Sequence, residues 1–117
     1  MTTRLDILQI KNLITAPVAV TTDYNSEVID ISNREDEFSV QVAYENGLAL
    51  DCVIAVEVSN DRVNFAPMDD VSKTDSGNSG HFFDFGGTGA AYLRVSITMN
   101  SGSLDLTQIL YKAKRRL

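Results

Sequence analysis

The residue types that most often carry enzyme chemistry are scarce in this chain. Its 117 residues include one histidine, His81, and one cysteine, Cys52. A serine hydrolase needs a histidine beside an exposed serine, and no Gly-x-Ser-x-Gly segment is present. Zinc sites need several Cys and His ligands at short spacing, whereas these two residues lie 29 positions apart. We therefore interpret His81 as a structural residue that begins a strand, and Cys52 as a small buried hydrophobe.

Carboxylates are numerous, but their spacing matches no known metal loop. Asp69, Asp70 and Asp75, with Asp84 further on, could offer the hard oxygen ligands that calcium prefers. The segment lacks an Asp-x-Asp-x-Asp-Gly run and the closing Glu of an EF-hand. We predict a solvated acidic segment, with a bound divalent ion as the alternative, and we interpret residues 33–37 in the same way. No cofactor is expected.

Phosphate and sugar chemistry also lack a clear motif. A phosphate loop ends in Lys-Ser or Lys-Thr at the start of a helix, but the segment 86–89 (Gly-Gly-Thr-Gly) leads into a strand pattern. No two carboxylates are placed as a glycosidase pair by their spacing. Tryptophan is absent, and we assign the four tyrosines to core or interface positions: Tyr24, Tyr44, Tyr92 and Tyr111. The chain is therefore predicted not to be an enzyme.

Charge is distributed unevenly. The net charge is −6, but four basic residues fall within 112–117, so residues 1–111 carry 6 basic against 16 acidic residues, or −10. An acidic body repels nucleic acid, so we expect no nucleic-acid partner. We interpret the basic tail as a solvated terminus or as an arm that docks on an acidic neighbouring subunit, with nucleic-acid contact as the least favoured reading.

Composition predicts one globular domain over residues 1–117, since 44% of residues are hydrophobic and 22% are charged. The first eleven residues alternate polar and apolar types and lack the continuous apolar core of a secretory signal. No uninterrupted apolar segment approaches the roughly 18 residues that cross a bilayer. We therefore expect synthesis in a host cytoplasm and no membrane partner.

Apolar residues alternate with polar ones along much of the chain, which is the pattern of half-buried strands. The clearest strands are 38–44 and 92–99, where Phe38, Val40, Val42 and Tyr44 share one face of the first. Other expected strands are 13–20, 27–31, 52–58, 63–68, 81–85 and 104–111, with a weaker one at 5–10. Turn residues at 22–26, 33–36, 45–47, 86–89 and 100–103 separate them. The sequence predicts a single antiparallel β-sandwich or jelly roll of about eight strands.

Residues 52–68 predict a hairpin, because Asn60 and Asp61 tolerate positive φ and bond their own backbone between two apolar runs. The longest polar segment follows at 69–80, which we expect to be a surface loop. Long loops often carry contacts, so this loop is a candidate interaction surface.

The segment 56–68, Val-Glu-Val-Ser-Asn-Asp-Arg-Val-Asn-Phe-Ala-Pro-Met, resembles a hairpin of small β-sandwich structural proteins and appendage modules of tailed bacteriophages. The segments 89–95 and 104–107 resemble the later strands of such modules. The likeness covers residues 52–112 in patches and departs at Arg62, where Gly is usual, so a longer turn is expected. It implies a virion protein that assembles as a symmetric oligomer, with a trimer favoured, on a major capsid or other virion protein.

The leading hypothesis is a non-enzymatic capsid decoration or cement subunit that stabilises the phage head. The alternatives are a neck, vertex or tail component, and a glycan- or surface-binding β-sandwich module. Residues 1–12 and 112–117 are predicted assembly arms, the first by strand addition to a neighbour. The predicted interface residues are Ile7, Ile10, Asp69, Asp70, Asp75, Lys112, Lys114, Arg115 and Arg116.

Overall fold

The computed structural model describes residues 5–32, 37–86 and 88–116, with side chains for 10–32, 37–86 and 88–114. The predicted all-β class is confirmed, and these residues contain eight strands and no helix. Accordingly, no helix in this part of the chain could cross a membrane. The strands are β1 (Leu5–Asn12), β2 (Val18–Val20), β3 (Tyr24–Asn25), β4 (Ile29–Asp30), β5 (Glu37–Ser59), β6 (Ala66–Lys73), β7 (Gly77–Gly86) and β8 (Tyr92–Arg116).

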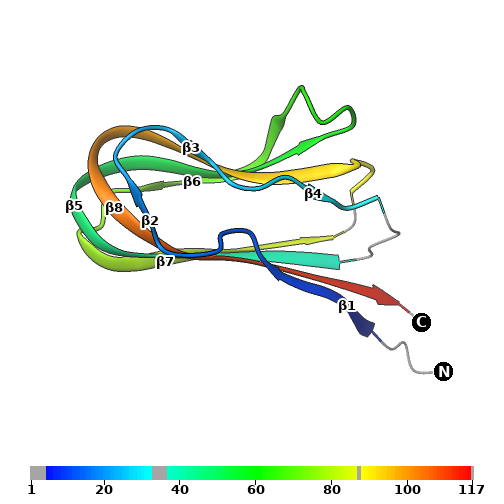
Figure 1. The fold of residues 1–117 in the computed structure, drawn as a ribbon. Coiled ribbons are helices and arrows are strands. Elements are labelled where there is room, and N and C mark those ends of the chain that lie inside the picture. Colours follow the sequence, from blue (N-terminus) through cyan, green and yellow to red (C-terminus); the bar gives the residue numbers. More distant parts are fainter. Residues whose placement is uncertain (1–4, 33–36, 87, 117) are drawn as a thin grey trace.

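All eight strands belong to one antiparallel, hydrogen-bonded sheet. The long strands β5 and β8 pair with each other along almost their whole length and form its centre. On the far side of β8 lie β1, β2, β3 and β4, and on the far side of β5 lie β7 and β6. Both long strands bend back on themselves, so the sheet folds into two facing layers (Figure 1).

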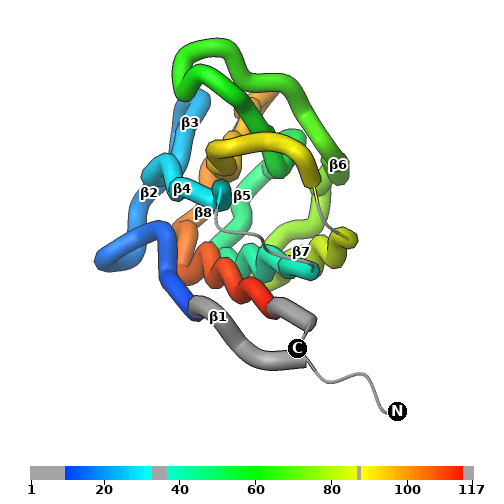
Figure 2. The backbone as a smooth tube through the Cα atoms, turned by 90° about the vertical axis from the view of Figure 1, so that its right-hand side faces the viewer, coloured from blue at the N-terminus to red at the C-terminus, as the bar shows by residue number. Residues whose placement is uncertain are grey.

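We name the two layers by their contents. The terminal layer holds β1, β7, residues 37–45 of β5 and residues 104–116 of β8. The hairpin layer holds β3, β4, β6, residues 52–59 of β5 and residues 92–99 of β8. The two views together show β1 running beside the end of β8 in the terminal layer (Figure 2).

Left-handed backbone conformations and register shifts produce the bends. In β5, Asn46 and Ala49 have φ of 55° and 48°, and in β8 Gly102 has φ of 80°. A Cβ atom on Gly102 would lie 2.3 Å from the carbonyl oxygen of Ala49. The predicted turns at 45–47 and 100–103 therefore bend two continuous strands instead of ending four shorter ones. The segments 38–44, 52–58, 92–99 and 104–111 are strand, as predicted. Their separation into four strands was the wrong part of the prediction, because the first two belong to β5 and the last two to β8.

The core lies between the two layers. Alternate side chains of β5 and β8 point inward, and the predicted buried face of 38–44 is confirmed. In β8 the inward positions change parity near Thr107, where the pairing with β5 shifts register, so Leu106 and Ile109 are both buried. Cys52 is also buried, as predicted, and burial raises the pKa of its thiol. The largest fully buried side chains include Tyr44, Tyr111, Phe83, Leu13, Ile54, Leu93 and Ile97.

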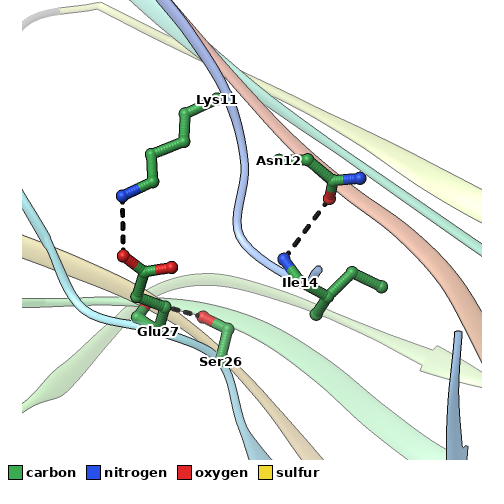
Figure 3. Close-up of polar contacts among 5 residues, drawn as sticks. All are labelled: Lys11, Asn12, Ile14, Ser26 and Glu27. Carbon is green, nitrogen blue, oxygen red and sulfur yellow. Dashed lines mark hydrogen bonds and ion pairs between the residues drawn. The ribbon is translucent and has the colours of Figure 1, made fainter. Parts of the chain in front are cut away.

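The N-terminal segment follows β8 as an interrupted edge, with short strands in place of the predicted 13–20 and 27–31. The Leu13 and Ser26 amides donate backbone hydrogen bonds to Ile109 and Val95 of β8, and side-chain oxygens of this edge accept further bonds from β8. Asn12 Oδ1 accepts from the Ile109 amide at 3.1 Å, and Ser26 Oγ accepts from the Val95 amide at 2.8 Å. Figure 3 shows two further contacts in this segment: Asn12 also accepts from the Ile14 amide, and Lys11 Nζ lies 2.6 Å from Glu27 Oε1.

The predicted loop 69–80 is largely strand. β6 continues to Lys73 and β7 begins at Gly77, so only residues 74–76 connect them. The polar residues form strands because one face of each is solvent-exposed, and an exposed strand face needs no apolar side chains. The hairpin predicted at 52–68 is confirmed, with residues 60–65 between β5 and β6. The predicted turn at 33–36 lies outside the described residues, as does Gly87 in the predicted 86–89 turn.

Candidate functional site

The outer side of the terminal layer carries apolar side chains on an otherwise polar surface. Along β7, Phe83 points into the core and is 1% exposed, whereas its neighbour Phe82 points outward and is 58% exposed. Strand register places Phe82 level with Gln41 of β5, and Gln41 level with Leu110 of β8. On β1, Ile10 pairs with Lys112 of β8 and is 56% exposed. Three strands other than β5 therefore each contribute an apolar side chain.

Charged side chains flank these apolar residues, with the cations and the anions on different strands. Lys112 and Lys114 lie on β8, whereas Glu37 lies on β5 and Asp84 on β7. The surface between them is hollowed, with a volume of about 360 Å³. We call this surface the outer face, and it consists of Ile10, Glu37, Ser39, Gln41, Phe82, Asp84, Leu110, Lys112 and Lys114.

The outer face differs from the rest of the described surface in how its cations are paired. Elsewhere, Lys11 pairs with Glu27 at 2.6 Å, Lys73 lies 3.6 Å from Asp75 and Arg94 lies 2.8 Å from Glu57. The guanidinium of Arg62 stacks 5.6 Å from the ring centre of Tyr92. By contrast, Lys112 and Lys114 form no ion pair with any residue whose side chain the structure describes.

Three of the nine predicted interface residues, Ile10, Lys112 and Lys114, meet on the outer face. Ile7 is level with Lys114 in the backbone register, but its side chain lies outside the described residues. The same holds for the side chains of Arg115 and Arg116, whose backbones pair with β1. Residues 5–12 and 112–116, predicted as arms, are strands of the same sheet. Their role in assembly stays a prediction.

The three predicted aspartates lie elsewhere. Asp69 and Asp70 are on β6 in the hairpin layer, and Asp75 is in the short connection to β7. Asp75 contacts Lys73 and accepts a hydrogen bond from Ser79. Among the side chains of residues 10–32, 37–86 and 88–114, no three His, Cys, Asp or Glu gather as metal ligands would. These aspartates thus do not extend the outer face.

Phe82 and Leu110 are members of the outer face that sequence reasoning missed. The signal was present in the run His81-Phe82-Phe83-Asp84-Phe85. Since successive strand residues point to opposite sides, placing Phe83 and Phe85 in the core forces Phe82 onto the outer surface. Leu110 could not be placed in this way, because the register shift near Thr107 reverses the alternation along β8.

The tip of the hairpin layer is a second exposed region, and its own hydrogen bonds organise it. The Asp61 carboxylate accepts from the amides of Asn64 and Val63, from the Asn64 side chain and from the Ser59 hydroxyl. These bonds, led by that of the Asn64 amide, hold the pKa of Asp61 well below its ordinary value. Arg62 has φ of 66°, so the usual glycine would fit this position. The tip is thus a self-contained turn.

The chain shares its fold with phage and prophage proteins. The sequence matches no protein-family model and no curated protein. In structure it is similar to the SPBc2 prophage-derived protein YomS, with a TM-score of 0.57, 10% identity, and coverage of 97% of this chain and 96% of that one. It is also similar to the enzymatically active domain of bacteriophage CBA120 tailspike protein 4, with a TM-score of 0.57 and 9% identity. That match covers 96% of this chain and 19% of the tailspike chain.

Proposed function

We propose that this protein is a non-enzymatic structural subunit of a phage particle that acts through its outer face. The observation that carries the proposal is the outer face itself, which exposes Phe82 and Ile10 among charged side chains. Exposed apolar groups rimmed by polar ones are typical of protein interaction sites. The fold shared with YomS and with a tailspike domain supports a phage setting.

Two places on the particle are candidates. The first is the capsid surface, where the protein would act as a decoration subunit and stabilise the head. The second is the tail, which the tailspike similarity favours, because there the same fold is one module of a tail protein. At either location, the protein would bind neighbouring virion proteins through its surface. In both, the protein is located in the virion.

Immunogold electron microscopy of purified particles tests the proposal and separates the two candidates. An antibody raised against the purified chain is applied to particles from a gradient. Gold on heads supports the decoration role, and gold at tails supports the tail component. Two controls use the same antibody: it should detect the chain in the infected-cell lysate and in denatured particles to which the purified chain has been added. If both controls are positive and the particles still bind no gold, a virion role is contradicted.

A further inference from the structure

We infer that the outer face binds a second copy of this chain around a two-fold axis, with Lys114 of each copy opposite Glu37 of the other. This inference deepens the proposed function, on which it rests, by naming the partner at that site. The argument uses the charge layout of the face, its apolar residues and the strand register.

The charges of the outer face are separated by strand. The cations Lys112 and Lys114 are on β8, and the anions Glu37 and Asp84 are on β5 and β7. A surface that carries both signs on opposite sides can complement itself, as a two-fold interface requires. A partner of one charge sign would leave half of these groups opposed by like charges. A second copy places β8, which carries the lysines, opposite β5, which carries Glu37.

Register defines the pairing. Lys114 and Glu37 are level with each other on neighbouring strands. If two faces meet about an axis parallel to the strands and midway between β5 and β8, Lys114 of each copy lies opposite Glu37 of the other. The same rotation places β7 opposite the other copy's β1. The strands that carry Phe82 and Ile10 then face each other. Register places Ile10 level with Asp84 of the other copy and Phe82 level with its Asn12, so both exposed apolar side chains lie within the interface.

The ion pairing of Lys112 and Lys114 within one chain is consistent with this arrangement. Within one chain Glu37 and Lys114 are level, yet no ion pair of 4.0 Å or less joins them, and Lys112 has none with Asp84. Every other cationic side chain that the structure describes has an anionic or aromatic contact. Among the described side chains, no carboxylate within ion-pair distance competes with a second copy for these lysines.

Sedimentation of the full chain tests the inference directly. We expect a dimer, twice the 12.8 kDa of one chain, that weakens as salt rises. Phe82→Ser should raise the dissociation constant at least about tenfold, because Phe82 is the aromatic anchor of the face. Val63→Ser is the matched control, since Val63 is 78% exposed on the distant hairpin tip. It should leave the dissociation constant unchanged, and circular dichroism checks that each variant is folded.

A charge exchange tests the register. Lys114→Glu alone and Glu37→Lys alone should each dissociate the dimer, because like charges then face each other. An equimolar mixture of the two variants should associate again, because every facing pair in the mixed dimer has opposite signs. The double variant Lys114→Glu/Glu37→Lys should dimerise by itself for the same reason. Failure of both the mixture and the double variant to associate would overturn this register.

The remaining outcomes are also decisive. A chain that stays monomeric up to high concentration, or a dimer unaffected by Phe82→Ser, would overturn the inference. A mass of three chains would favour the trimer expected from the sequence over the two-fold pair. A monomer that is nevertheless found on particles would leave the proposed function standing and remove only this inference. If the protein forms the dimer but is absent from particles, the proposed function is removed and the two-fold pairing stands.

Discussion

Asp61 shows how one side chain can organise a turn at the surface. Its carboxylate accepts bonds from two backbone amides, one side-chain amide and one hydroxyl. Because these donors favour the charged form, the folded-state pKa of Asp61 is depressed, and the carboxylate stabilises the fold when ionised. The contribution is present above the ordinary pKa of 3.8 and is lost as the pH falls through the lower folded-state value.

Asp61→Asn should therefore destabilise the protein in a pH-dependent manner. Near neutral pH the variant should unfold at a lower urea concentration than the wild type. Below pH 3.8 the difference between the two midpoints should narrow, because the unfolded wild-type chain binds a proton at this carboxylate while the folded chain still holds it ionised. Asp70→Asn, which removes an exposed β6 charge, serves as the control. A difference that stays constant from pH 7 to pH 2.5 would mean that the ionised carboxylate is not what stabilises the tip.

At the scale of the element, Gly102 allows strand β8 to bend where it lies against β5. The residue has φ of 80°, and an added Cβ would approach the carbonyl oxygens of Ala49 and Leu48 within 2.3 Å and 2.4 Å. Backbone atoms cannot move aside as a flexible side chain can. The bend is what brings the two layers together, so its geometry affects the whole core.

Gly102→Ala should destabilise the protein by about 2 kcal/mol or more, combining left-handed backbone strain with the steric clash. Gly89→Ala is the matched control, since a Cβ there would meet nothing within 4 Å. It should change the free energy of unfolding by less than about 0.5 kcal/mol. Equal midpoints for both variants in chemical denaturation would show that the bend does not depend on glycine.

Side-chain hydrogen bonds add to the backbone pairing between the interrupted edge and β8. Ser26 is 7% exposed, and its hydroxyl oxygen accepts from the buried Val95 amide at 2.8 Å. Ser26→Ala should cost about 1–3 kcal/mol in the free energy of unfolding, since it leaves a buried donor unpaired. Ser76→Ala, at an exposed connection residue, should be close to neutral. If hydrogen exchange at the Val95 amide were unchanged in Ser26→Ala, the proposed pairing would be wrong.

At the scale of the whole molecule, local alternation in the sequence predicted the all-β class and the inward face of residues 38–44, and the turn chemistry of Asn60 and Asp61 predicted the hairpin. It did not predict that β5 and β8 each continue as one strand, because residues such as Asn46 and Gly102 are found both in turns between strands and in bends within a strand. Only the pairing of β5 with β8 on both sides of these residues determines that the strands continue. For the same reason, two strands were interpreted as four.

The candidate site was predicted in part. Ile10, Lys112 and Lys114 were identified from the composition of the two chain ends, but their convergence depends on the pairing of β1 with β8. The aspartates were attributed to a loop that is mostly strand, because polar composition alone cannot distinguish a loop from a solvated edge. Such pairing between distant segments leaves little trace in a single sequence.

Quantitative mass spectrometry of gradient-purified particles tests the central claim most directly. The amount of this chain is measured against a known particle component, before and after repeated banding in the gradient. A structural subunit should be present in multiple copies per particle, and its ratio to the known component should stay constant through repeated banding. A chain that is abundant in the infected-cell lysate but lost from the particles on purification would contradict the account.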